Sequence, residues 1–545
     1  MNRLQVFITT LLTLGSLVGF QGSAFALPGD LDISFGGDGW VSTQAPGSNG
    51  SLGTSLLVQP DQKIVAGGMA AFDNNNLDFC LTRYLPDGSL DNTFGNGGIV
   101  LTDFPGNDGN RPADFISDLA IQRDGKIVAA GGSVLGTNLP ISQMPPNAGD
   151  LNFALARYLP NGSLDPSFGV NGLVSLDFSG IAALDQINSV KIQRDGKIVA
   201  AGQVAVARGS SNYDFAVARF NEDGSLDPSF GNGGQVRIDF FQGSNASANA
   251  LQIQGDGKIL LAGSTNQSSL IPGNDFALAR LNTDGSLDVS FGNGGLVTTN
   301  FLQAQFFTQN SDDIAYGLLL QGDGKIVTAG VSIEQNPLRA RIALARYLSD
   351  GSLDVAFGDR GKVLTDFSDL NPNAFADGRD LVLQGDGKIL VAGNVMSDLN
   401  QPFNSDFALA RYLPDGQLDG TYGRGGKVVA NFPEQQRGLD GANEIALQAD
   451  GKALAVGYVQ LGQAGNTNLL AFGLARFEGD KEVITETPEE ETGAPREAPG
   501  LQLVLQGGAC AFTPSPGAPN FSLWIETALV MAFFLGFKFL RRPKL

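Results

Sequence analysis

The sequence contains no histidine and only two cysteines, and its 35 basic residues are outnumbered by 56 acidic ones. Without histidine there is no Ser-His-Asp or Cys-His catalysis, no His-ligated zinc and no histidine pH sensor. Two cysteines rule out a multi-disulfide framework and a four-cysteine metal site. The formal charge of −21 argues against a nucleic-acid partner, because phosphate binding needs a basic surface.

The 545 residues are nevertheless rich enough in apolar side chains to bury a core, since 42% are hydrophobic and only 17% charged. Glycine is abundant, with 73 residues, which indicates many turns.

Residues 1–26 have the features of a secretory signal peptide. Arg3 gives a positive start, residues 4–20 are mostly apolar, and Ala24-Phe25-Ala26 fits the small-x-small cleavage rule. We expect cleavage after Ala26, so that the mature chain leaves the cytosol; an uncleaved membrane anchor is the alternative.

The other end carries a second apolar segment, residues 523–540, followed by a basic tail, residues 541–545. Its length is close to the minimum for a transmembrane helix, and the tail should stay cytoplasmic by the positive-inside rule. A buried core helix is the alternative. Residues 479–522 are acidic and proline-rich and predict an extended linker.

A short motif in that linker, Gly507-Gly508-Ala509-Cys510, precedes a proline-rich spacer, the apolar segment and the basic tail. The three-part pattern resembles the C-terminal sorting signals of bacterial envelope proteins. The resemblance implies that Cys510 is a site of processing or lipidation, while an ordinary tail anchor with an incidental cysteine stays open.

Seven internal repeats fill the middle of the chain, residues 27–478. The pattern Leu-Asp-x-x-Phe-Gly-x-x-Gly begins at Leu31, Leu90, Leu164, Leu226, Leu287, Leu353 and Leu418, with Tyr422 in the last phenylalanine slot. A second pattern, close to Gln-x-Asp-Gly-Lys-Ile, and a third, close to Phe-Ala-Leu-Ala-Arg-Tyr, recur with it.

Each repeat divides into four short strand candidates, which in the second copy are 115–122, 126–130, 153–158 and 172–178. Asp-Gly pairs predict tight hairpins. Four strands repeated seven times without helical periodicity predict an all-β, seven-bladed β-propeller. Separate small β domains and an open solenoid are the alternatives.

The two ends of the array are halves of one repeat. Arg476 has no Leu-Asp unit after it, and the Leu31-Asp32 unit has no arginine before it. We therefore expect residues 39–43 to supply the outermost strand of the last blade and to close the ring, leaving no exposed edge.

The Asp-Gly-Lys-Ile hairpin and the Leu-Asp-x-x-Phe-Gly-x-x-Gly turn resemble those of the bacterial delta-60 repeat proteins, a predicted β-propeller group. The resemblance covers residues 27–478. It implies a secreted or surface propeller and supplies no mechanism, because the family has no established common activity.

In six repeats an aspartate follows the arginine by eight residues, and for Arg476 the counterpart is Asp32 at the start of the array; we expect each pair to form a structural ion pair. The phenylalanine should pack between blades and the hairpin lysine should be solvated. The pairs are Arg83 and Asp91, Arg157 and Asp165, Arg219 and Asp227, Arg280 and Asp288, Arg346 and Asp354, Arg411 and Asp419, and Arg476 and Asp32.

Two copies space oxygen-bearing side chains in a way that faintly resembles a short calcium loop. These calcium candidates are Asn221, Asp223, Asp227, Asn282, Asp284 and Asp288. The favoured interpretation is Asx-type turns, because no bidentate glutamate follows. Cys80 replaces a small residue of its strand and should be a buried thiol.

Strand parity places two connections of each repeat on one face and two on the other. The nearly constant hairpins and turns share one face, and variable connections such as 132–150, 300–312, 331–341 and 394–406 share the opposite one. A ligand site, if present, belongs on the variable face near the channel. Apolar candidates for contact are Phe306, Phe307, Phe403 and Tyr213.

The function that the sequence favours is a non-enzymatic binding or adhesion module, exported and tethered at the bacterial cell surface. It would be monomeric, without a cofactor, and would bind an unknown protein or polysaccharide. The alternatives are an extracellular carbohydrate-active enzyme using loop carboxylates, for which Asp312-Asp313 is an example, or an envelope scaffold.

Overall fold

The computed structural model describes residues 26–480 apart from 73–75, 105–112, 135–150, 181–183, 208–211, 242, 269–270, 303–310, 336–337, 370–373, 397–403, 433–437 and 465–466. The predicted signal segment before Ala26, Cys510, the apolar segment 523–540 and the basic tail lie outside the described residues. Within the described part, no helix is long and apolar enough to cross a membrane.

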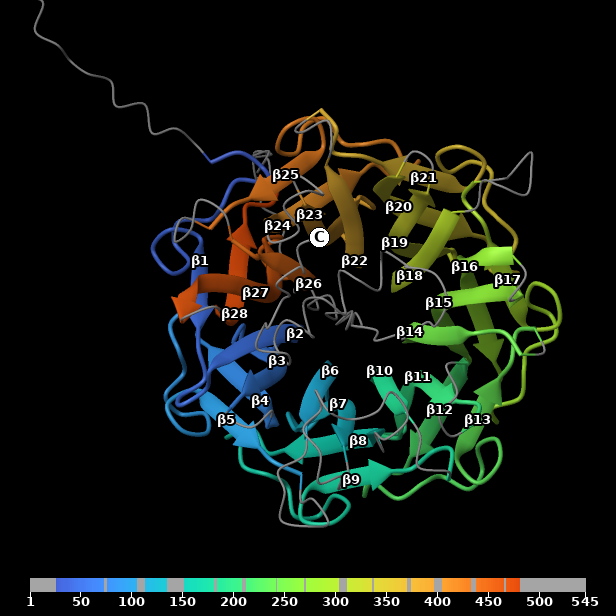
Figure 1. Cartoon of the computed structure of the whole chain (residues 1–545), viewed down its shortest axis with the longest axis horizontal. Helices are drawn as coiled ribbons and strands as arrows, with labels where there is room; N and C mark the ends of the chain where they lie inside the picture. The colour runs from blue at the N-terminus through green and yellow to red at the C-terminus, as the bar shows by residue number, and fades with distance from the viewer. Residues whose placement is uncertain are drawn as a thin grey trace, which may run out of the picture.

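Seven four-stranded antiparallel sheets surround a central axis and form the blades of a β-propeller (Figure 1). We number the blades from the first complete sheet. The inner strand of each blade lies beside the axis and comes first in its repeat, whereas the outer strand has only four residues.

The strands of the first four blades have the following bounds. Blade 1 contains β2 (Gly50–Val58), β3 (Ile64–Ala71), β4 (Leu77–Tyr84) and β5 (Ile99–Thr102). Blade 2 contains β6 (Asp114–Ile121), β7 (Ile127–Val134), β8 (Leu151–Tyr158) and β9 (Leu173–Leu176). Blade 3 contains β10 (Asp185–Ile192), β11 (Ile198–Ala205), β12 (Tyr213–Phe220) and β13 (Gln235–Ile238). Blade 4 contains β14 (Ala246–Ile253), β15 (Ile259–Ser268), β16 (Ile271–Leu281) and β17 (Leu296–Thr299).

The last three blades complete the ring. Blade 5 contains β18 (Ser311–Leu320), β19 (Ile326–Gln335), β20 (Leu338–Tyr347) and β21 (Lys362–Thr365). Blade 6 contains β22 (Phe375–Leu383), β23 (Ile389–Met396), β24 (Ser405–Tyr412) and β25 (Lys427–Ala430). Blade 7 contains β26 (Gly441–Leu447), β27 (Ala453–Ala464), β28 (Thr467–Phe477) and β1 (Trp40–Thr43).

Closure of the ring follows the sequence prediction. The N-terminal strand β1 pairs antiparallel with β28, the third strand of blade 7, in a register that joins Trp40 to Ala475 and Thr43 to Phe472. The first and last parts of the described chain therefore build one sheet, and the seven-bladed all-β architecture is confirmed.

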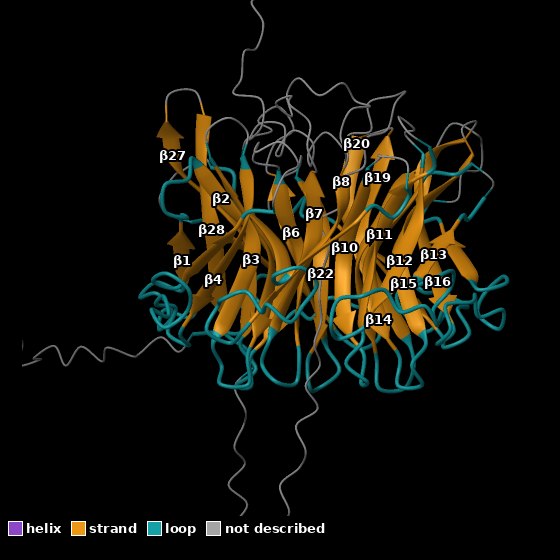
Figure 2. Cartoon of the chain, turned by 90° about the horizontal axis from the view of Figure 1, so that it is seen from below, coloured by secondary structure: helices purple, strands orange, loops and turns teal. Residues whose placement is uncertain are grey.

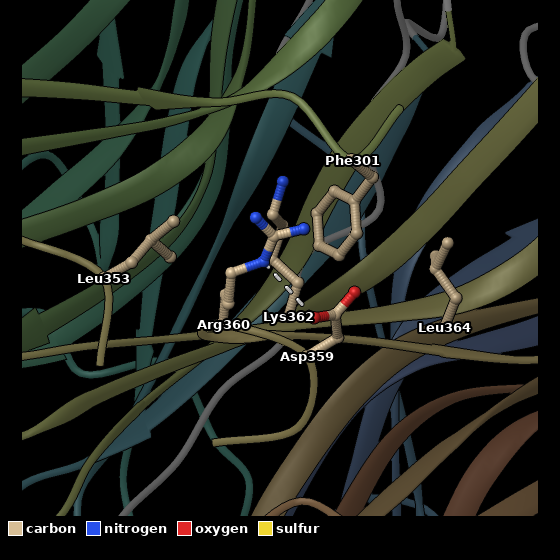
Figure 3. Close-up of a pocket in the computed structure, with 6 residues that line it drawn as sticks. All are labelled: Phe301, Leu353, Asp359, Arg360, Lys362 and Leu364. Carbon is tan, nitrogen blue, oxygen red and sulfur yellow. Dashed lines mark hydrogen bonds and ion pairs between the residues drawn. The ribbon is translucent and has the colours of Figure 1, made fainter. Parts of the chain in front are cut away.

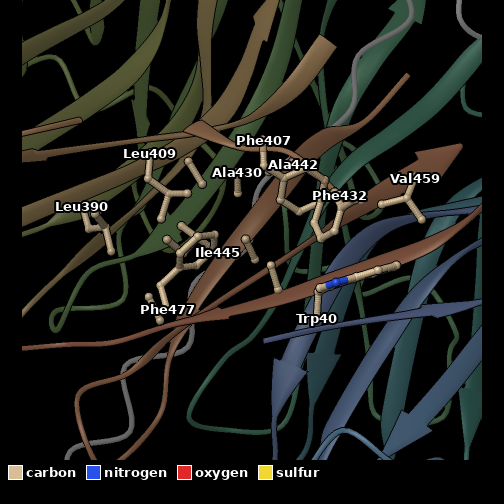
Figure 4. Close-up of a cluster of buried hydrophobic side chains, with 14 of the residues drawn as sticks. Trp40, Leu390, Phe407, Leu409, Ala430, Phe432, Ala442, Ile445, Val459 and Phe477 are labelled. Atoms are coloured by element: carbon tan, nitrogen blue, oxygen red, sulfur yellow. The ribbon is translucent and has the colours of Figure 1, made fainter. Parts of the chain in front are cut away.

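The hydrophobic core lies between neighbouring blades rather than in one centre. Between blades 6 and 7, Phe407 and Phe432 pack edge to face with ring centroids 4.8 Å apart, and Trp40 of β1 meets Phe432 at 5.0 Å (Figure 4). Alanines such as Ala442 and Ala455 let the sheets approach closely around these rings.

The two faces of the disc differ as strand parity requires. The hairpin between the first two strands of each blade and the turn between the last two emerge on one side, called here the constant face, where the described loops gather in Figure 2. The other connections emerge on the opposite, variable face. One sequence expectation was wrong here: residues 331–341 belong mostly to β19 and β20, which extend toward the tip of their hairpin.

The contribution of the closing strand β1 to the stability of the propeller can be tested by replacing Trp40. Trp40→Ala should lower the free energy of unfolding by about 3 kcal/mol, because it removes a large buried side chain and leaves a cavity beside Phe432. Urea unfolding followed by circular dichroism measures this loss. Val289→Ala, at a side chain that is 78% exposed, is the matched control and should leave the midpoint unchanged. Equal midpoints for the two variants would contradict the importance of this contact.

Candidate functional site

The repeat arginine and aspartate pair in all seven blades, as predicted. The arginine nitrogen lies 2.6 to 2.9 Å from the aspartate Oδ2, and both side chains are buried. Each guanidinium also lies over the aromatic ring of its own repeat, 4.4 to 4.8 Å from the centroid. The pair therefore fixes the turn between the third and fourth strands.

The same turn is bonded to the next blade. Arg219 Nη1 donates to the carbonyl of Thr283, and Arg280 Nη1 donates to that of Ser349, both at 2.6 Å. In every blade, the amide of the glycine after the aromatic residue also donates to a carbonyl of the following blade; Gly231 to Asp284 and Gly423 to Pro28 are two examples. The recurring residues thus hold adjacent blades together.

The lysine of the hairpin also contacts the aspartate of the ion pair. The sequence did not predict this contact. The lysine ammonium lies 2.6 to 3.6 Å from the same aspartate in all seven blades, and its side chain is only 20–33% exposed. The expectation of a freely solvated lysine was therefore wrong. The available signal was that one lysine and one arginine recur with the aspartate in every repeat, because both cations bind that carboxylate.

The aspartates of these triads hold their charge strongly. Burial alone would raise the pKa of Asp32, but hydrogen bonds from Lys452 and Ser34 outweigh it and lower the pKa to about 2. For Asp165, hydrogen bonds from Ser167 and the charge of Arg157 likewise overcome burial and lower the pKa to about 2. The triads therefore stay ionised at neutral pH.

Removal of one guanidinium tests the structural role. Arg280→Ala should cost about 3 kcal/mol of stability, because Asp288 stays buried with only Lys258 as its cationic partner and the bond to Ser349 is lost. Thermal unfolding measures the cost, and ligand binding by the folded remainder should persist. Arg424→Ala, at an exposed arginine in the turn before β25, is the control. An unchanged melting temperature for Arg280→Ala would refute the role.

The calcium candidates lie in exposed turns of the constant face or in the triads. Asp223 accepts hydrogen bonds from the amide and hydroxyl of Ser225, which is the geometry of an Asx turn, and Asn221 donates to Leu226. The second set, Asn282, Asp284 and Asp288, repeats these contacts. Across the described residues, no group of three or more acidic, cysteine or histidine side chains is placed to hold a metal ion.

The two predicted processing residues and the strand cysteine have different surroundings. Cys80 is fully buried in β4, and burial raises the pKa of its thiol far above the usual value, so it is unreactive. Ala26 is the first described residue, and Cys510 lies outside the described part of the chain.

Two expectations for the variable face were wrong. Tyr213 is not available for contact, because it lies fully buried in β12. Asp312 and Asp313, considered as loop acids, are buried in β18; Asp312 accepts from Asn274, and Asp313 accepts from the amide of Phe301. Burial raises the pKa of Asp313 to about 7. Phe306, Phe307 and Phe403 lie outside the described residues.

Every inner strand contains a β-bulge at the same level of the axis. The bulge turns two adjacent side chains toward the next blade, where they bond backbone groups. Asn188 donates to the carbonyl of Ala248 at 2.9 Å, and Asn249 repeats this contact one blade further on. These bonds form an inner ring of inter-blade contacts, which no sequence pattern revealed.

Carboxylates at the next position of three inner strands add a second kind of contact, because they accept from an amide of the following blade. Asp118 accepts from the amide of Val190, Asp380 from that of Ile445, and Glu444 from that of Leu56. Lys191 Nζ lies 3.1 Å from Asp118 Oδ2. Three buried acids, from blades 2, 6 and 7, and one buried lysine, from blade 3, therefore lie near the central axis. These four residues are the main departure of the inner strands from seven-fold repetition.

Two of these axial acids, Glu444 and Asp380, have pKa values raised above the usual carboxylate range. Burial, with the charges of Asp118 and Asp380 adding to it, raises the pKa of Glu444 well above its usual value. Burial raises the pKa of Asp380 to about 7. Because Glu444 Oε1 has no hydrogen-bond partner within the described structure, ionisation of Glu444 is poorly compensated.

Stability should therefore depend on pH in a defined direction. An acid with a raised pKa binds more protons in the folded than in the unfolded state, so its contribution falls as pH rises from about 5 to about 8. Glu444→Gln keeps an acceptor for Leu56 and cannot ionise. Its melting temperature should match the wild type at about pH 5 and exceed it increasingly toward pH 8. A constant difference across this range would contradict the assignment.

Comparison with known proteins supports the fold and leaves the activity open. Six segments, residues 59–94, 146–168, 193–230, 254–291, 321–357 and 384–422, match the model of a family described as "Domain of unknown function (DUF5122) beta-propeller". The matched segments, which together span less than half of the chain, are similar to that propeller family. No curated protein matches this chain.

Solved structures with a similar chain path have very different sequences. A protein of unknown function from Dyadobacter fermentans is 12% identical, with a TM-score of 0.37 over 66% of this chain and 93% of that one. The Trypanosoma rangeli sialidase is 11% identical, with a TM-score of 0.37, and the match spans 81% of this chain and 57% of the sialidase. The β-propeller domain of the trilobed protease from Pyrococcus furiosus is 8% identical, with a TM-score of 0.35 over 79% and 95% of the two chains.

Proposed function

We propose that this chain is a non-enzymatic binding module of the bacterial cell envelope, exported and tethered through its C-terminal segment. It presents the variable face of the propeller to a protein or polysaccharide partner. The observation that carries the proposal is the position of both ends of the described chain on the constant face.

The two ends lie beside blade 6. Gly423 donates its amide to the carbonyl of Pro28, which holds the N-terminal segment against the constant-face turn of blade 6. Asp480, the last described residue, accepts from Arg411 at 2.9 Å and pairs with Lys388 at 2.7 Å. A tether that continues from Asp480 therefore begins on the constant face, and the opposite face is directed away from it.

The distribution of polar groups supports the same orientation. On the constant face, the recurring arginine, aspartate and lysine side chains are engaged in the triads and in bonds between blades. The connections on the other face differ in length and sequence from blade to blade. Variable connections on a rigid scaffold are the common location of binding residues.

Photocrosslinking in intact producing cells tests the orientation and the binding together. A photoreactive residue at Phe241 or Ser368, both exposed on the variable face, should give discrete adducts of the full-length protein. The same residue at Gly255 or Gly385, which have open space around them on the constant face, is the matched control and should give none. Adducts confined to the constant-face positions, or absent from all four, would contradict the proposal.

A further inference from the structure

A cavity of about 540 Å³ opens at the outer edge of the disc between blades 4 and 5. Asp359, Arg360, Lys362 and Leu364 line it from blade 5, together with Leu353, and Phe301 lines it from the connection after β17 (Figure 3). Two cations and one acid give this cavity a net positive charge on a protein of charge −21.

Arg360 departs from the repeat at a position where the backbone is left-handed. Its φ is 51°, and the same slot in other copies holds Gly97, Gly233, Gly294, Gly425 or Asn171, all with positive φ. A side chain with a Cβ is disfavoured there, so nothing in the turn itself calls for arginine. Its side chain is 84% exposed, and its guanidinium lies 3.4 Å from the carboxylate of Asp359.

Lys362 provides the second cation. Its ammonium donates to the carbonyl of Asn300 at 2.8 Å and lies 5.9 Å from the centroid of Phe301. Figure 3 shows the head groups of Lys362 and Arg360 pointing the same way beside the Phe301 ring. Among the described residues, no carboxylate pairs with Lys362.

The neighbouring groove shows what such a lysine binds. Lys427 occupies the equivalent position between blades 5 and 6, lies 5.3 Å from the ring of Phe367 and donates to the carbonyl of Asp366. There the carboxylate of Asp369 completes the site by pairing with the ammonium. The groove at Lys362 therefore repeats a carboxylate site whose acid is not supplied by the described chain.

We propose that the cavity at Lys362 and Arg360 binds the carboxylate of an acidic sugar, such as a uronic acid residue of an extracellular polysaccharide. The ammonium of Lys362 takes the position relative to the carboxylate that Lys427 has relative to Asp369, and Arg360 donates a second charged hydrogen bond. Asp359 accepts from sugar hydroxyls, and Leu353 and Leu364 offer apolar contact to the ring. The cavity has room for a disaccharide.

Binding of a galacturonic acid disaccharide to the full-length protein, measured by calorimetry, tests this site. The neutral galactose disaccharide should bind at least about tenfold more weakly, because it brings no carboxylate to the two cations. Lys362→Met, which keeps the apolar stem, should weaken uronate binding by about tenfold or more. Arg360→Gly should also weaken binding, with a melting temperature equal to or above the wild type, since glycine accepts the positive φ.

Two variants in the next groove serve as controls. Lys427→Met should leave uronate binding unchanged, because Asp369 already neutralises that lysine. Asp369→Asn should create a second, weaker site by freeing Lys427. Unchanged binding in Lys362→Met would overturn the proposal, as would a glutamate dipeptide that binds as tightly as the uronate. Neither crosslinking position, Phe241 or Ser368, lines this cavity, so failure of uronate binding and failure of the crosslinking test are distinguishable.

Discussion

The bond between the repeat arginine and the turn of the next blade is the interaction on which the disc depends. A single blade is a four-stranded sheet that cannot bury both of its faces, so its stability comes from its two neighbours. The arginine is paired with an aspartate of its own blade and donates to a carbonyl of the following one. Its planar, permanently charged head presents several N–H donors in fixed directions, so it can bond the carboxylate and the carbonyl at once.

The inner ring performs the same task with different chemistry. Near the axis the inner strands converge. Each β-bulge leaves backbone groups without a partner in their own sheet, and side chains of the preceding blade form hydrogen bonds with these groups. An asparagine donates to a carbonyl of the next blade in blades 3, 4 and 7, and an acid accepts from an amide of the next blade in blades 2, 6 and 7. Either side chain satisfies the backbone, but the acids make the axis sensitive to pH. The triad aspartates have lowered pKa values, whereas Glu444 and Asp380 on the axis have raised ones, so the two groups respond to pH in opposite directions.

The fold could be predicted from the sequence because every repeat contains the same pattern of strands and turns. The spacing of Arg476 and Asp32, at opposite ends of the array, predicted the pairing of β1 with β28. The same reasoning failed where burial decides the role. Asp313 follows a variable connection and could not be distinguished from a solvated loop acid. Tyr213 begins a strand that the sequence placed in a loop. The lysine triads and the inner ring depend on contacts between repeats, which a pattern within one repeat does not contain.

Departures from the repeat carry most of the functional information in such a protein. A residue that recurs seven times serves the blade, whereas a single exception needs a separate explanation. Arg360 is an exception that the fold tolerates at a conformational cost, and Lys362 lies beside it without the acid that its counterpart Lys427 has. The axial acids are exceptions as well, but their carboxylates accept backbone bonds, so their role in the disc is accounted for. The cavity at Lys362 and Arg360 has no such structural use, which is why it is assigned to a ligand.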